Sequence, residues 1–142
     1  MDSYNNSEGS ITFDSVGEQS VAYLIQVARI GIDFPRFNAL ALCCPFSMSE
    51  WSEFLHLSER TIQRYQKEKK SFDPAASGRI IEILVLYKMV ISALGSKSKA
   101  NTWLDTESVA LGGARPKELL DTSLGIQLLK EEILRIEHGV LA

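Results

Sequence analysis

Positive charge gathers in one short segment of the sequence, LSERTIQRYQKEKKSF, which runs from Leu57 to Phe72. The segment holds five basic and two acidic residues, although the 142-residue chain has a formal net charge of -3. Lysine and arginine at this density are typical of surfaces that contact a polyanion, such as the phosphate backbone of a nucleic acid. Glutamine and arginine can also bind base edges in the major groove. The segment therefore indicates nucleic-acid binding, provided that a helix presents these side chains together.

The elements expected around this segment form a helix-turn-helix. Ser47 or Ser49 caps a first helix that runs to Leu55, and Ser58 caps a second helix, ERTIQRYQKEK, after a tight turn. Such a pair places the N-terminal part of its second helix in the major groove of DNA. We therefore predict that eight residues contact DNA: Ser58, Arg60, Thr61, Gln63, Arg64, Lys67, Lys69 and Lys70.

These residues suit different parts of the DNA. Gln63 and Arg64 have the chemistry for base edges, glutamine for adenine and arginine for guanine. The other basic residues suit phosphate contacts: Arg60, Lys67, Lys69 and Lys70. The alternative is that this charged helix face is simply solvated, which fits the helix pair equally well because short helix pairs are common in helical domains.

No group of residues has the spacing of a catalytic or metal site. Cys43 and Cys44 are adjacent, so they suit neither a disulfide nor a zinc site and are expected to pack as small apolar residues. His56 and His138 lie far apart, and the stretch ALGGARP lacks the lysine and the hydroxyl residue of a P-loop. The sequence therefore predicts a protein that is not an enzyme and that needs no cofactor or metal.

The composition predicts a folded, soluble and cytoplasmic protein. Hydrophobic residues make up 45% and charged residues 23% of the chain, which is enough to bury a core. The polar N-terminus, MDSYNNSEGS, lacks the pattern of a signal peptide. The longest apolar run, Ile80 to Leu94, is interrupted by two charges and is shorter than the roughly 20 residues of a membrane-spanning helix. That run is expected either in the core or at a subunit interface.

Helical periodicity divides the chain into a tail and two domains, and no strand pattern exceeds a few residues. Residues 1–17 are predicted to be a flexible tail, residues 18–95 a helix-turn-helix and dimerisation domain, and residues 96–142 a second domain. The predicted fold is thus all-α, with an N-terminal helix-turn-helix domain followed by a small helical domain.

The first expected helix runs from Glu18 to Ile30 and ends at Gly31. The i, i+3, i+4, i+7 spacing predicts that one side of it faces the core. The residues on that side are Val21, Leu24, Ile25 and Ala28. Asp33 is the expected cap of the next helix, which Pro45 follows.

In the C-terminal region, Ser98 and Thr106 are expected to cap short helices, and Gly139 is expected to end the last one. An apolar stripe along this last helix is formed by Leu124, Leu128 with Leu129, Ile133 with Leu134, and Ile136. Leu104, Leu119 and Leu120 are expected in the core of this region. Further residues are predicted to serve the fold as core, turn or cap: Trp103, Leu111, Gly112, Gly113, Pro116 and Thr122.

Three stretches, taken in order, match the pattern of a known family. The first, LSERTIQRYQ, is similar to Ser-x-Arg-Thr-(Leu/Ile)-x-Arg, and the second is SGRIIEI, in which Gly78 stands where an acid is common. The third and most specific begins at Trp103 and contains Leu-Gly-Gly-x-x-Pro, Thr-x-x-Gly and Ile-Glu-His-Gly-Val. On these motifs the chain, from about Ala28 to Ala142, resembles the MbcA/ParS/Xre antitoxins, the partners of RES-domain toxins.

The resemblance implies an Xre-like protein with two binding functions. Its helix-turn-helix would bind operator DNA, an inverted repeat that controls its own operon. Its C-terminal domain would bind a NAD-degrading RES-domain toxin from an adjacent gene and cover the toxin's active site, and the antitoxin would be a homodimer. The residues that would bind the toxin are Glu131, Leu134, Arg135, Glu137, His138, Gly139, Val140, Leu141 and Ala142. The alternative is a helix-turn-helix regulator without a toxin partner, whose C-terminal region serves dimerisation.

Overall fold

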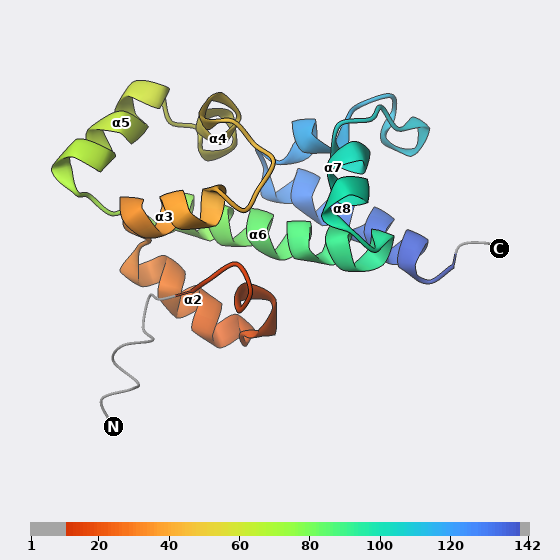
Figure 1. Ribbon diagram of the computed structural model, residues 1–142, viewed down its shortest axis with the longest axis horizontal. Coiled ribbons are helices and arrows are strands. Elements are labelled where there is room, and N and C mark those ends of the chain that lie inside the picture. Colours follow the sequence, from red (N-terminus) through yellow and green to blue (C-terminus); the bar gives the residue numbers. More distant parts are fainter. Residues whose placement is uncertain (1–10, 140–142) are drawn as a thin grey trace. The chain divides into compact units, whose positions relative to one another are not determined.

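The chain is all-α, as the sequence predicts. The computed structural model describes residues 11–139, which contain helices but no strand and only one isolated bridge, between Asp33 and Ser71. The described residues form two compact units, 11–84 and 85–139, and helix α6 (Pro74–Leu94) runs from the first unit into the second (Figure 1). None of the helices within residues 11–139 is long and apolar enough to cross a membrane.

Capping side chains begin the helices of the first unit. Asp33 and Ser58 cap their helices as predicted, and the cap between the two is Ser47 rather than Ser49, with Glu50 completing a capping box. Each cap satisfies a backbone N–H that the first turn leaves unpaired. The elements before α6 are η1 (Val16–Glu18), α2 (Val21–Ile30), α3 (Phe34–Ala41), α4 (Met48–Leu55) and α5 (Glu59–Glu68).

An aromatic cluster forms the centre of the first unit. The ring centroid of Phe37 lies 5.2 Å from that of Trp51 and 5.0 Å from that of Phe72, and both pairs meet edge to face. Trp51 in turn lies 5.8 Å from Phe54. Such pairs add about 0.5–1.5 kcal/mol each to the free energy gained by burying the rings. The cluster joins α3, α4 and the segment before α6, and so fixes the position of α4 within the first unit.

Two residues of the SGRIIEI motif connect α6 to the rest of the first unit. The buried Ser77 hydroxyl accepts a hydrogen bond from the backbone N–H of Ile32 at 2.9 Å and donates one to the carbonyl of Phe72 at 3.1 Å. Two residues later, Arg79 donates from Nη1 to the carbonyl of Phe54, near the end of α4, at 3.1 Å. The serine and the arginine of this motif therefore serve the fold.

The apolar run from Ile80 to Leu94 lies mainly in the core. Ile80, Leu84 and Val90 have no solvent exposure, and Ile83 and Leu86 are 1% exposed. This burial favours the core over a free subunit interface, the two places that the sequence left open.

The prediction for α2 is wrong for two of its four inward-facing residues. Val21 is 74% and Ile25 46% exposed, Leu24 and Ala28 are half-buried, and Val27 is the buried residue of the helix. The reason lies in the composition of α2, VAYLIQVARI, which has apolar residues on nearly every side. Periodicity therefore could not determine which side faces the core.

The first unit also includes part of the stretch that the sequence assigned to a tail. Ile11 is 5% exposed and Val16 is fully buried, and the N–H of Val16 donates to the carbonyl of Thr12 at 3.0 Å. The two units meet within α6, after Leu84. The predicted domain boundary instead lies at the end of that helix, after Gly95.

In the second unit, Thr122 caps the last helix as predicted, through its hydroxyl and the N–H of Gly125 at 2.9 Å. The cap of α7 is Ser96, because Ser98 lies inside that helix. Thr106 caps no helix, since its hydroxyl donates to the carbonyl of Thr102. The elements are α7 (Lys97–Leu104), η2 (Val109–Leu111), η3 (Pro116–Leu119) and α8 (Ser123–Glu137).

The core of the second unit is built from the last turns of α6, from α7 and α8, and from Leu120 between η3 and α8. Pro116 is buried at the start of η3, whereas Trp103, Leu111 and Leu119, which the sequence places in the core, are half-buried. The side chains of this unit that are at most 2% exposed are Leu86, Tyr87, Val90, Ala100, Leu104, Leu120, Ile126, Leu129 and Ile133.

A closed loop precedes η3. Gly112 and Gly113 have positive φ angles of 71° and 90°, a conformation that side chains disfavour. Gly113 donates from its N–H to the carbonyl of Ser108 at 2.8 Å and so closes the turn. Nearby, the hydrogen bond and the charge of Lys117, whose Nζ lies 2.8 Å from Asp105 Oδ1, hold the pKa of Asp105 below its usual value. The pair stabilises the folded chain while Asp105 is ionised, and this contribution is lost as the pH falls through the lowered pKa.

Candidate functional site

The helix pair α4–α5 is joined by a short turn that the backbone stabilises. His56 ends α4 in the left-handed conformation, with a φ of 56°, and the N–H of Leu57 donates to the carbonyl of Ser52 at 3.0 Å. Ser58 then starts α5 by accepting the N–H of Thr61 at 3.0 Å. Two short helices with this connection form the predicted helix-turn-helix.

One side of α5 is anchored to the first unit. Ile62 is 1% exposed, and the ring of the half-buried Tyr65 lies 5.3 Å from that of Phe72. Because these residues are three apart on the helix, they fix its rotation. The positions that remain for solvent carry mostly polar and charged side chains.

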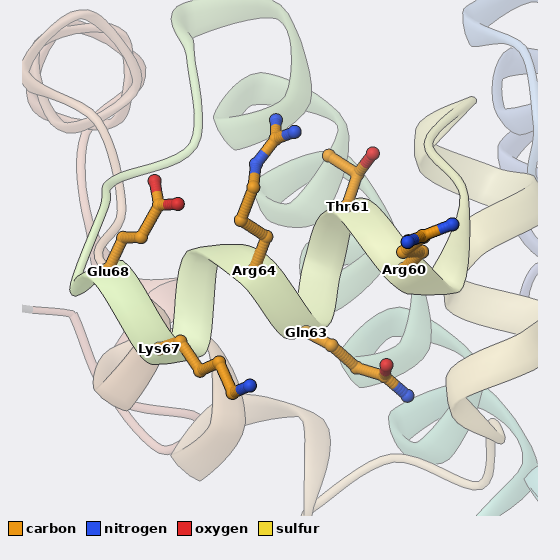
Figure 2. A pocket seen from close by; sticks show the side chains of 6 residues that line it. All are labelled: Arg60, Thr61, Gln63, Arg64, Lys67 and Glu68. Carbon is orange, nitrogen blue, oxygen red and sulfur yellow. The ribbon is translucent and has the colours of Figure 1, made fainter.

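Three basic residues form a stripe along the exposed side of α5. Arg60, Arg64 and Lys67 follow the i, i+4, i+7 spacing of one helix face and are all exposed, and we name them the basic stripe. Figure 2 shows these side chains with the others that line the same depression, whose volume is about 440 Å³. Its remaining lining residues are Thr61, Gln63 and Glu68.

The other residues predicted to contact DNA lie at the two ends of α5. Ser58 also donates from its hydroxyl to that of Thr61 at 2.9 Å, so both hydroxyls belong to the cap. Lys69 ends the helix in the left-handed conformation, and Lys70 lies beyond it with Nζ 3.3 Å from Glu68 Oε1. The structure thus gathers Arg60, Gln63, Arg64 and Lys67, and places the two last lysines outside the helix.

The chemistry of this face suits a nucleic acid. Guanidinium and ammonium groups on one exposed helix face can neutralise phosphates, and Arg64 beside Gln63 offers donors to base edges. Within residues 11–139, no group of three or more His, Cys, Asp or Glu side chains could hold a metal ion.

The second candidate site is the exposed face of α8. Ile126, Leu129 and Ile133 face the core, which leaves the opposite face to solvent. The exposed residues of α8 and its cap include Leu128 and five residues predicted to bind a partner, Glu131, Leu134, Arg135, Glu137 and His138. Arg135 is held by Glu132, with Nη2 2.8 Å from Oε1.

The end of α8 is defined as far as Gly139. Glu137 is the last helical residue, and Gly139 follows it with a φ of 68°. The three remaining residues predicted to bind a partner, Val140, Leu141 and Ala142, lie outside the described residues.

The predicted apolar stripe of α8 divides between the core and the solvent. Leu124 is 85% and Leu128 42% exposed, whereas Leu129 and Ile133 are fully buried. The doublets Leu128–Leu129 and Ile133–Leu134 were the available signal, because adjacent residues of a helix point about 100° apart and cannot all face one core.

Two family models match the chain, one in each unit. Residues 26–85 match the antitoxin Xre-like helix-turn-helix domain. Residues 89–139 match the antitoxin Xre/MbcA/ParS C-terminal toxin-binding domain.

The chain is also similar to a curated protein of Yersinia enterocolitica serotype O:8 / biotype 1B named "Antitoxin Xre". The two are 26% identical over 120 residues, which cover 84% of this chain and 81% of the relative. Neither antitoxins nor helix-turn-helix regulators are enzymes, so these matches confirm the prediction that the chain is not an enzyme.

Proposed function

Because this chain belongs to the Xre/MbcA/ParS antitoxin family, we propose that it neutralises a NAD-degrading RES-domain toxin and represses its own operon. The coarser part of this function follows from the family, since the chain joins a helix-turn-helix domain to a toxin-binding domain. The toxin class, the NAD chemistry, the homodimer and the autorepression are our proposals. They place the protein in the cytoplasm, where operator DNA and NAD are both present.

The basic stripe is the observation that supports operator binding most directly. It lies on the exposed side of the second helix of the helix-turn-helix, which is the element that enters the major groove in such proteins. A homodimer would present two such helices to an inverted repeat, with half-sites separated by about one helical turn or a multiple of it.

The proposal for the toxin concerns the end of α8. The exposed face offers the apolar side chains of Leu128 and Leu134 near Glu131 and Glu137, and the sequence continues beyond Gly139 with Val140, Leu141 and Ala142. A cleft that binds an anionic dinucleotide is commonly basic, so an acidic helix end suits it. We propose that this helix end covers the active-site entrance of a toxin from an adjacent gene.

The proposed function is tested in cells. The adjacent reading frame is expressed with and without this chain, and the NAD content is followed over the next minutes. We expect NAD to collapse when the neighbour is expressed alone and to be preserved when the chain is present. If NAD never falls, or falls in both cases, the toxin proposal is wrong and the chain acts as a helix-turn-helix regulator.

Removing the Arg64 side chain tests base recognition. If Arg64 binds a guanine, Arg64→Ala should cost about 1–3 kcal/mol of operator binding and relax the specificity at that base. Titrations of operator and of random DNA by fluorescence anisotropy measure both effects.

Lys69→Ala is the matched control for Arg64→Ala. Removing a lysine that contacts phosphate should weaken binding to both DNAs alike. It should also reduce the slope of log K against log salt concentration by roughly one unit. Equal losses on operator and random DNA with Arg64→Ala would show that Arg64 reads no base.

A further inference from the structure

Helix α2 carries an apolar side that stays exposed within residues 11–139. Val21 is 74% and Ile25 46% exposed, Ala22 is exposed beside them, and Arg29 is the one charged residue of the ten in this helix. A helix that is apolar on nearly every side is normally buried against another element. The exposed side of α2 therefore has the composition of an interface.

We propose that the exposed side of α2, formed by Val21, Ala22, Ile25 and Arg29 and named here the α2 face, is the contact between two copies of this chain. The inference rests on the homodimer of the proposed function and identifies its interface. A two-fold dimer uses the same patch on both copies, so the patch must be complementary to itself. An apolar helix face meets this requirement, because each copy buries its valine and isoleucine against those of the other.

The charges at the two ends of the α2 face favour antiparallel pairing. Arg29 lies in the last turn of α2, and the exposed Glu18 lies in η1, just before the first turn. A two-fold axis near the middle of α2 reverses one helix against the other. Arg29 of each copy then approaches Glu18 of the other, whereas a parallel pair would bring the two arginines together.

The α2 face leaves the basic stripe free. In Figure 1, α2 and α5 lie on opposite sides of α3 and the first turns of α6. One helix of ten residues from each copy makes a small interface, so we expect a dissociation constant in roughly the micromolar range for the free protein.

Sedimentation equilibrium of the full chain under reducing conditions tests the α2 face. The mass of the wild-type chain should rise towards that of two chains as the concentration increases. Ile25→Glu places a charge in the contact and should raise the dissociation constant at least about tenfold. Leu42→Glu is the matched control, because Leu42 is an apolar residue of the same unit that is 78% exposed outside α2, and it should dimerise like the wild type. Circular dichroism checks that both variants are folded.

A charge reversal separates a direct contact from an indirect effect. Glu18→Arg and Arg29→Glu should each weaken the dimer, and the double variant should restore it. If Ile25→Glu dimerises like the wild type, the α2 face is not the interface, although the homodimer stands. If the wild type stays monomeric at every concentration, both ideas fail. If it becomes dimeric only after deletion of residues 2–10, the N-terminal segment covers α2 and the proposal is wrong.

Discussion

Gly125→Ala should lower the free energy of unfolding of the chain by about 3 kcal/mol or more. Gly125 lies in the first turn of α8, where a Cβ atom would overlap the carbonyl oxygen of Leu119 and lie 3.0 Å from its carbonyl carbon. A backbone carbonyl cannot swing aside as the end of a side chain can. The added methyl group would therefore force η3 and α8 apart, at the contact that closes the core of the second unit.

Gly78→Ala is the control for this prediction. Gly78 is also helical, but a methyl group added there would meet no atom within 4 Å, and its φ is not positive. Alanine is favoured over glycine in a helix interior, so this substitution should stabilise the chain by about 0.5–1 kcal/mol. Urea unfolding followed by circular dichroism measures both. Equal stability of Gly125→Ala and the wild type would mean that η3 and α8 are less closely packed than the structure has them.

Features that depend on local sequence were predictable. Ser58 and Thr122 are caps because a side-chain oxygen reaches an N–H only a few residues away, and such contacts are encoded within one turn. The alternation of Ile62 and Tyr65 with basic residues likewise indicated which side of α5 stays in solvent. The all-α fold and the helix-turn-helix followed from signals of this kind.

Features that depend on distant partners were not predictable. Gly125 is the last residue of the Thr-x-x-Gly motif. The need for glycine at this position depends on the carbonyl of Leu119, which lies close to Gly125 only because η3 packs on α8. In α2, the sequence identified a helix and could not tell that Val27 rather than Val21 faces inward. Val21 stays 74% exposed within residues 11–139, because which of the apolar sides of α2 packs inward is decided by elements distant in the sequence.

A chain truncated after Glu137 should lose toxin neutralisation and keep operator binding. The truncation removes the last five residues, including Val140 and Leu141, and retains Ile133 and the other buried residues of α8. If both apolar side chains are buried in the toxin, each contributes about 1.5–3 kcal/mol, and even the lower value makes the loss of toxin affinity roughly a hundredfold. The basic stripe lies in the first unit, so the operator affinity should be unchanged.

The loss of neutralisation is measured as the NAD content of cells that express the adjacent toxin together with each chain, and operator binding is measured on the same purified proteins. A chain without residues 2–10 is the control, since it loses a segment at the other terminus and should protect NAD like the wild type. Leu134→Glu extends the test into α8, because Leu134 is 42% exposed and lies in the last turn of this helix. If the truncated chain preserves NAD while Leu134→Glu does not, the helix face carries the inhibition and the tail is dispensable. If both variants preserve NAD, the toxin binds another surface of the second unit.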